Sequence, residues 1–191
     1  MGSDFIYILS SLPLLKLSGE GAMEYGAFLE SCGGMLSSRE RETLSRLVLQ
    51  EKPGVVREEP VLGQWDQWLE TMRQVSAAWR GARRPGDAGA VSSLRPRRES
   101  YPGDVRRLEA ILAMEGLAAK QDAWEALQWS RLEELSLAHG FDFSALLVYA
   151  LKLRLLESRS RRTLEAGTRA FEKLVASRLS EAVEGRLAVE E

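Results

Sequence analysis

The chain has 191 residues, of which 45% are hydrophobic and 28% charged, and its formal net charge is -2. This is the composition of a globular domain, and a chain of this length buries enough surface to need no metal or disulfide. The near-neutral charge excludes a global basic field that would attract nucleic acid. Cys32 is the only cysteine and cannot form an internal disulfide, which favours a reducing compartment. We expect a soluble cytoplasmic protein without signal peptide or membrane span, because no uncharged run approaches roughly 20 residues.

The first segment, residues 4–17, reads DFIYILSSLPLLKL. Its apolar run is compatible with a strand or a short helix, because so short a run does not discriminate. We favour a short buried helix, since no second strand is apparent to pair with it, and we expect Pro13 to end it. Residues 18–22, SGEGA, predict a turn.

Two short helices are predicted next. Residues 23–32 have Tyr25, Phe28 and Leu29 at inward positions, and Gly33 and Gly34 predict a left-handed C-cap. Ser37 and Glu40 have the spacing of a capping box, which predicts the start of the following helix. The inner stripe of that helix consists of Leu44, Leu47 and Val48, and Pro53 and Gly54 end it.

Residues 61–80 predict a longer amphipathic helix, because large apolar residues recur at steps of three and four. These are Trp65, Trp68 or Leu69, Met72, Val75 and Trp79. The composition then changes to glycine, serine, arginine and proline over residues 81–103. With few apolar residues to order it by burial, this stretch predicts a flexible or loosely ordered loop.

Two more helices follow the loop in the sequence. Asp104 predicts an N-cap for a helix over residues 105–115, and Gly116 interrupts the pattern before a helix over residues 120–138. The inward positions are Val105, Leu108, Ile111 and Leu112 in the first, and Trp124, Leu127, Trp129, Leu132 and Leu135 in the second. Gly140 closes the second helix.

Residues 141–157, FDFSALLVYALKLRLLE, predict the central helix of the fold. A helix that is apolar nearly all round is buried on several sides, so Leu147 is expected in the core, and Asp142 is a candidate N-cap. Residues 158–188 keep apolar residues at helical spacing within a charged stretch. The sequence therefore predicts an all-α, single-domain helical bundle over residues 1–191, with the loop at 81–103.

No catalytic or metal-binding constellation is apparent in the sequence. His139 is the only histidine, and beside Gly140 it is interpreted as a helix-end residue that interacts with free carbonyls. Cys32 lies in the last turn of a predicted helix, where the helix dipole disfavours a thiolate. Glu133 and Glu134 are adjacent on a helix and do not face each other. We expect neither an enzyme nor a cofactor.

The clearest local charge feature is a group of arginines in and beside the loop: Arg80, Arg83, Arg84, Arg95, Arg97 and Arg98. This group is either a solvated loop or a site for the phosphates of RNA or for an acidic protein. We therefore take Arg83, Arg84, Arg95, Arg97 and Arg98 as candidate partner-binding residues. Aromatic residues that could stack on bases are not interleaved among them, Tyr101 apart, which makes RNA the weaker choice.

The stretches FIYILSSLPLLKL, EYGAFLESCGGMLS and FDFSALLVYALKLRLLESR together resemble a small bacterial family of unknown function. Genes of that family are found among those for bacterial V-type ATPases. Both ends are also distantly similar to the C/d component of the central stalk of these rotary enzymes, an all-helical adaptor between shaft and membrane ring. Lys152 is followed by Leu153 and Arg154, where the C/d component favours acids, so no binding residue is transferred.

The resemblance implies a non-enzymatic accessory protein of a V-type ATPase, either a stalk adaptor or an assembly factor. Its partners would be V-type ATPase subunits on the stalk or membrane-ring side, and the protein would lie in the cytoplasm, peripheral at the inner face of the membrane. The alternative hypothesis is a helical module that binds RNA or an acidic protein through the arginine-rich loop. Neither hypothesis requires a small-molecule substrate.

Overall fold

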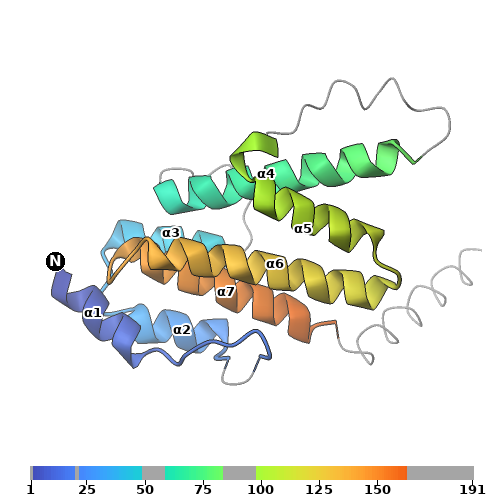
Figure 1. The fold of residues 1–191 in the computed structure, drawn as a ribbon. Helices are drawn as coiled ribbons and strands as arrows, with labels where there is room; N and C mark the ends of the chain where they lie inside the picture. Colours follow the sequence, from blue (N-terminus) through green and yellow to red (C-terminus); the bar gives the residue numbers. More distant parts are fainter. Residues whose placement is uncertain (1, 20–21, 49–58, 84–97, 163–191) are drawn as a thin grey trace, which may run out of the picture. The chain divides into compact units, whose positions relative to one another are not determined.

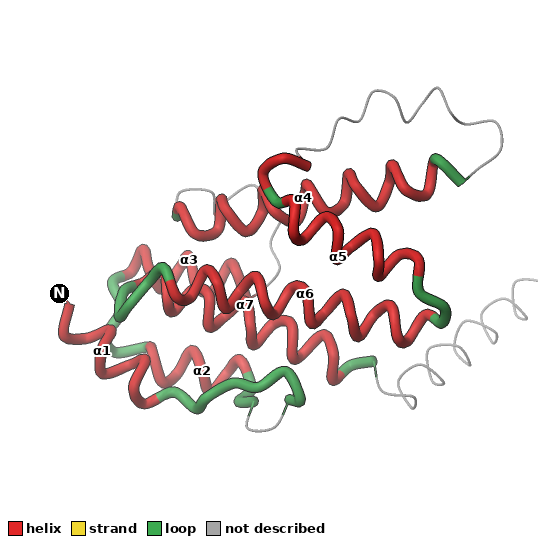
Figure 2. Tube along the Cα trace, viewed as in Figure 1, coloured by secondary structure: helices red, strands yellow, loops and turns green. Residues whose placement is uncertain are grey.

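The computed structural model describes residues 2–19, 22–48, 59–83 and 98–162. Within these residues the chain forms seven α-helices and one short 3-10 helix, and it forms no strand (Figures 1 and 2). The predicted all-α fold is confirmed.

The chain divides into two compact units, Met1–Leu155 and Leu156–Glu191. Of the second unit the structure describes only residues 156–162. The prediction of one helical domain over 1–191 therefore stays a prediction. The apolar pattern was predicted for residues 158–188, and residues 163–188 of this range lie outside the described part of the chain.

Helix α1, Gly2–Ser11, ends before Pro13 as predicted. Its burial is one-sided. Ile8 is fully buried, whereas Ile6 and Tyr7 are exposed, so the prediction of a buried helix is wrong for one of its faces. The apolar run of α1 indicated correctly that the helix packs against the rest of the protein. A run this short does not indicate how many of its faces are buried.

Helices α2, Tyr25–Cys32, and α3, Ser38–Val48, are separated by a short turn. The left-handed cap predicted at Gly33 is wrong, because this residue has a right-handed φ of -61°. A Cβ there would approach the carbonyl oxygens of Leu29 and Glu30 at 3.3 and 3.4 Å, so crowding favours glycine at this position. The capping box is confirmed, since the Ser37 amide and hydroxyl donate to Glu40 at 2.8 and 2.7 Å.

Helix α4, Pro60–Gly81, is the longest described helix. Four of the positions predicted to face inward are buried: Trp65, Trp68, Met72 and Val75. The fifth, Trp79, is only half-buried. The loop bounds of 81–103 are wrong at both ends. Gly81 belongs to α4, and helical backbone is present from Arg98, before residue 103. Residues 84–97 lie outside the described part of the chain.

A 3-10 helix, η2, Arg98–Ser100, precedes helix α5, Pro102–Ala113. The N-cap predicted at Asp104 is wrong. Tyr101 holds the cap position, and Pro102 starts the helix because its missing amide is no loss there. Asp104 instead lies in the first turn and contacts Trp68 of α4. Helix α5 packs against α4 and against α6.

Helix α6, Leu117–Leu137, starts after Gly116, whose φ of 82° is readily adopted only by glycine. Helix α7, Phe143–Ser160, follows a short connection. The prediction that α7 is central is confirmed by its burial, and Leu147 is inaccessible to solvent. Its other buried residues are Ala145, Leu146, Val148, Ala150, Leu151, Leu153 and Leu156.

Candidate functional site

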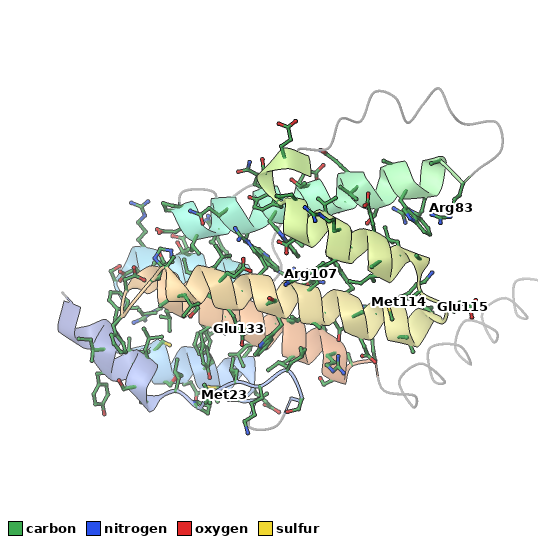
Figure 3. The ribbon with its side chains drawn as sticks, viewed as in Figure 1. Met23, Arg83, Arg107, Met114, Glu115 and Glu133 are labelled. Atoms are coloured by element: carbon green, nitrogen blue, oxygen red, sulfur yellow. The ribbon has the colours of Figure 1, made fainter. Side chains whose placement is uncertain are left out.

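The two N-terminal stretches that carry the family resemblance contact the third stretch, residues 141–159, through Tyr149 of α7. The ring of Tyr149 stacks on Phe28 of α2, with centroids 5.4 Å apart and planes inclined by 26°. Its hydroxyl donates a hydrogen bond of 3.0 Å to the carbonyl oxygen of Pro13. The same hydroxyl lies 3.8 Å from the sulfur of Met23, which is labelled in Figure 3. One side chain thus joins α7 to α2 and to the segment after α1.

Two further contacts connect the same segments. The Tyr25 hydroxyl donates to the carbonyl oxygen of Ala150 over 2.9 Å. Phe5 of α1 faces Phe143 at the start of α7, with ring centroids 6.1 Å apart. These aromatic side chains therefore hold together segments that lie far apart in the sequence. The hydroxyls of Tyr25 and Tyr149 both donate to backbone carbonyl oxygens.

The environment of this contact favours the protonated forms of the Tyr149 hydroxyl and the Cys32 thiol. Burial, together with the nearby Cys32, raises the pKa of Tyr149 to about 12. Burial also raises the pKa of the Cys32 thiol, and the hydrogen bond with Ser31 opposes this effect. A thiol held neutral in this way is a poor nucleophile at physiological pH. The contact is therefore chemically suited to holding helices together.

A second polar group lies between α6 and α7. The indole nitrogen of Trp129 donates 2.8 Å to a carboxylate oxygen of Glu133, which Figure 3 labels. The Lys152 ammonium lies 5.1 Å over the Trp129 ring, and burial lowers its pKa against the opposing charge of Glu133. Lys152 can therefore be half-buried on α7, because the face of the Trp129 ring and the carboxylate of Glu133 both stabilise its positive charge.

His139 does not make the predicted carbonyl contact with its side chain. Its Nδ1 atom lies 3.1 Å from Asp142 Oδ2, and the other oxygen of Asp142 accepts the Ala145 amide at 2.8 Å. The N-cap prediction for Asp142 is confirmed by this second bond. His139 does lie at the end of α6, but its partner is a carboxylate that the turn brings back toward it.

The candidate arginines are only partly described. Arg83 is exposed at the end of α4 and places its guanidinium 3.5 Å from the centroid of the Trp79 ring (Figure 3). Arg98 begins η2. The other three candidates, Arg84, Arg95 and Arg97, lie outside the described residues. The structure therefore brings no two of the five candidates together in its described part, but it gives Arg83 an aromatic partner that the sequence did not predict.

The described ranges contain neither a metal-binding cluster nor a membrane-spanning helix. Among these residues no three histidine, cysteine, aspartate or glutamate side chains are arranged to hold a metal ion. None of the described helices has the length and apolar character to cross a membrane.

Sequence reasoning missed the tyrosine contacts and the pairing of Trp68 with Asp104. A signal for both exists in the sequence. A tyrosine or tryptophan on an otherwise apolar helix face needs a hydrogen-bond partner when it is buried, but the sequence does not say which acceptor supplies it. The acceptors here are distant along the chain, and for Tyr149 and Tyr25 they are backbone carbonyls.

Comparison with known proteins adds no relative. No protein-family model, curated protein or solved structure matches the chain.

Proposed function

We propose that the protein is a non-enzymatic, helical accessory protein of a bacterial V-type ATPase, acting as a stalk adaptor or an assembly factor. The proposal starts from the family resemblance of the two N-terminal stretches and of residues 141–159. The observation that supports it is that Tyr149 packs on Phe28 and bonds to Pro13. Within the unit Met1–Leu155, residues of the stretches that resemble one family therefore pack together and can present a shared surface.

The chemistry of this contact supports a scaffold in preference to a reactive site. Tyr149 and Cys32 are held in their neutral forms, and the hydroxyl of Tyr149 is occupied by a backbone carbonyl. An adaptor needs helices fixed in position so that its partner meets a preformed surface, which lowers the entropy cost of association. Its partners would be ATPase subunits of the stalk or membrane ring, reached from the cytoplasmic side.

Co-purification tests the proposal. The full chain, tagged and expressed at native level, is recovered from its own cells and the bound proteins are identified by mass spectrometry. ATPase subunits should be enriched with the wild type. They should be lost with Leu147→Ala, which disturbs a fully buried position, and retained with Leu117→Ala, whose side chain is exposed. Recovery of the wild type without ATPase subunits would overturn the proposal.

The alternative, recognition of RNA or an acidic protein by the arginine-rich loop, is supported by one contact. Arg83 is exposed and its guanidinium lies 3.5 Å from the centroid of the Trp79 ring, and such an exposed guanidinium can also contact a base or a carboxylate. Under this alternative, changing Arg83 together with Arg95 and Arg97 to alanine should abolish RNA or peptide binding. The binding of RNA by the wild type should also fall steeply with salt. Unchanged binding in the triple variant would remove the alternative.

A further inference from the structure

The hydroxyl of Tyr149 in α7 has two acceptors within reach. It donates to the carbonyl oxygen of Pro13 at 3.0 Å and lies 3.8 Å from the sulfur of Met23, which is labelled in Figure 3. A phenol has a single hydrogen to donate, and a thioether sulfur is a weak acceptor. The carbonyl of Pro13 therefore takes this hydrogen, and Met23 lies beside the bond as a weaker competitor.

The bond to Pro13 holds residues 12–19, the described segment after α1, against α7. These residues form no helix, so no ladder of backbone hydrogen bonds fixes them. Leu15 is buried, but Leu14 beside it is 82% exposed. A segment with few buried contacts opens locally at low cost in free energy. How firmly it is held thus depends on individual bonds such as the one from Tyr149.

Two sulfur atoms lie near the Tyr149 hydroxyl, and they differ in their access to oxidants. Met23 is partly exposed, whereas Cys32 is fully buried. Burial also raises the pKa of the Cys32 thiol, and a protonated thiol reacts slowly with oxidants. A methionine sulfur has no proton to lose, so its reactivity depends on its exposure. We therefore expect hydrogen peroxide to oxidise Met23 before Cys32.

Oxidation by hydrogen peroxide turns the sulfur of Met23 into a polar sulfoxide. The sulfur lone pair attacks one peroxide oxygen, the O–O bond breaks and hydroxide leaves. The hydroxide then takes the proton of the transferred oxygen and becomes water, so the sulfur loses two electrons and the peroxide gains them. The product carries an S=O oxygen, a stronger acceptor than a thioether, on a sulfur that already lies 3.8 Å from the Tyr149 hydroxyl.

The hydroxyl keeps its hydrogen at physiological pH, because burial and the nearby Cys32 raise the pKa of Tyr149 to about 12. Oxidation thus changes the acceptors and leaves the donor unchanged. We propose that Met23 is a redox-sensitive switch: as a sulfoxide it takes the hydrogen bond of Tyr149 from Pro13 and loosens residues 12–19 from α7. Methionine sulfoxide reductases reverse this oxidation, so the contact can be restored. The inference does not depend on the proposed ATPase role.

Hydrogen exchange of the full chain, measured by mass spectrometry before and after treatment with hydrogen peroxide, tests this switch. Peptide mapping first identifies the oxidised residues. Met23 should be oxidised, while Met72, which is 1% exposed, and Cys32 should not. The amides of residues 14–19 should then exchange about three- to tenfold faster, a factor that corresponds to the loss of one hydrogen bond. Treatment with methionine sulfoxide reductases should restore the slower exchange.

Three variants assign the effect to this pair of residues. Tyr149→Phe lacks the hydroxyl, and Met23→Leu has no sulfur at this position, so peroxide should leave the exchange of residues 14–19 unchanged in both. Met114→Leu is the matched control, because Met114 is 39% exposed but lies at the α5–α6 connection. This variant should respond to peroxide as the wild type does.

Circular dichroism first establishes that each variant is folded. If Met23→Leu unfolds, the comparison of the wild type with Tyr149→Phe decides. Equal exchange of residues 14–19 in the oxidised and the reduced wild type would overturn the switch. So would a peroxide response that persists in Tyr149→Phe or disappears in Met114→Leu, or a Met23 that resists oxidation until Met72 reacts.

Discussion

Trp68 of α4 donates a hydrogen bond from its indole nitrogen to a carboxylate oxygen of Asp104 in α5, over 2.7 Å. Trp68 is fully buried, and its ring stacks on Trp65, with centroids 5.1 Å apart, and on Trp124 of α6, with centroids 5.6 Å apart. One side chain therefore connects three helices. Its polar edge is satisfied by a charged acceptor, which makes a stronger bond than a neutral acceptor would.

Replacing Asp104 by alanine should destabilise the protein by about 1–3 kcal/mol, because the buried indole N–H would lose its partner. Asp104→Asn retains an acceptor oxygen and should cost less. The measurement is urea unfolding followed by tryptophan fluorescence. In the double variant with Trp68→Phe, the alanine change should cost less than it does alone, because no indole N–H remains to be satisfied. Additive costs would contradict the importance of this bond.

Leu147→Ala should lower the free energy of unfolding by roughly 2–5 kcal/mol, since it removes buried methyl groups and leaves a cavity. Leu147 is inaccessible in α7, whereas Leu117 is 85% exposed in α6. Leu117→Ala is the control and should change stability by no more than about 0.5 kcal/mol. Thermal and urea unfolding of both variants check this difference. Equal effects would mean that α7 is not the core of the unit.

Tyr149→Phe should cost about 0.5–1.5 kcal/mol, because the hydroxyl hydrogen bond to Pro13 is lost while the ring can still stack on Phe28. The ionisation of the Tyr149 hydroxyl should also be visible in the free energy of unfolding of the wild type at alkaline pH. Folding raises the Tyr149 pKa from 10.0 to about 12. Between these values the unfolded chain releases its proton first, so the folded state loses stability as pH rises.

The control for this effect is Tyr149→Phe itself, in which the fall of stability between pH 10 and about 12 should be smaller. Below pH 10 the contribution of the phenol should not change with pH. A pH profile of the free energy of unfolding that is identical in the two proteins would show that Tyr149 ionises as freely in the fold as outside it.

Ser37→Ala should destabilise α3 by about 1 kcal/mol through loss of the capping box. The Ser37 hydroxyl accepts the Glu40 amide at 3.3 Å and donates to its carboxylate at 2.7 Å. Chemical denaturation measures the change. Ser37→Asp, which can still accept the amide, should retain more stability than Ser37→Ala, and the reverse order would argue against a capping role.

Much of the fold could be predicted because its signals are local. The stripe of α4, the capping box of α3, the cap at Asp142 and the burial of Leu147 all follow from spacing within a few residues. Boundaries were less secure. Asp104 has the chemistry of an N-cap, but Tyr101 and Pro102 start α5 earlier, and a distant indole takes the carboxylate. Of the candidate arginines, the stacking of Arg83 on Trp79 was not predicted.

The sequence by itself determined that this chain is helical, because apolar residues recur with the period of an α-helix and proline, glycine and capping residues separate the runs. Only the tertiary structure decided which sides of the helices meet. Ile8 and Tyr7 are adjacent apolar residues of α1, yet one is buried and the other exposed. Tyr149 finds its acceptor in Pro13, far away in the chain. Periodicity is a property of neighbours along a helix, whereas burial and hydrogen-bond partners depend on which distant segments pack together.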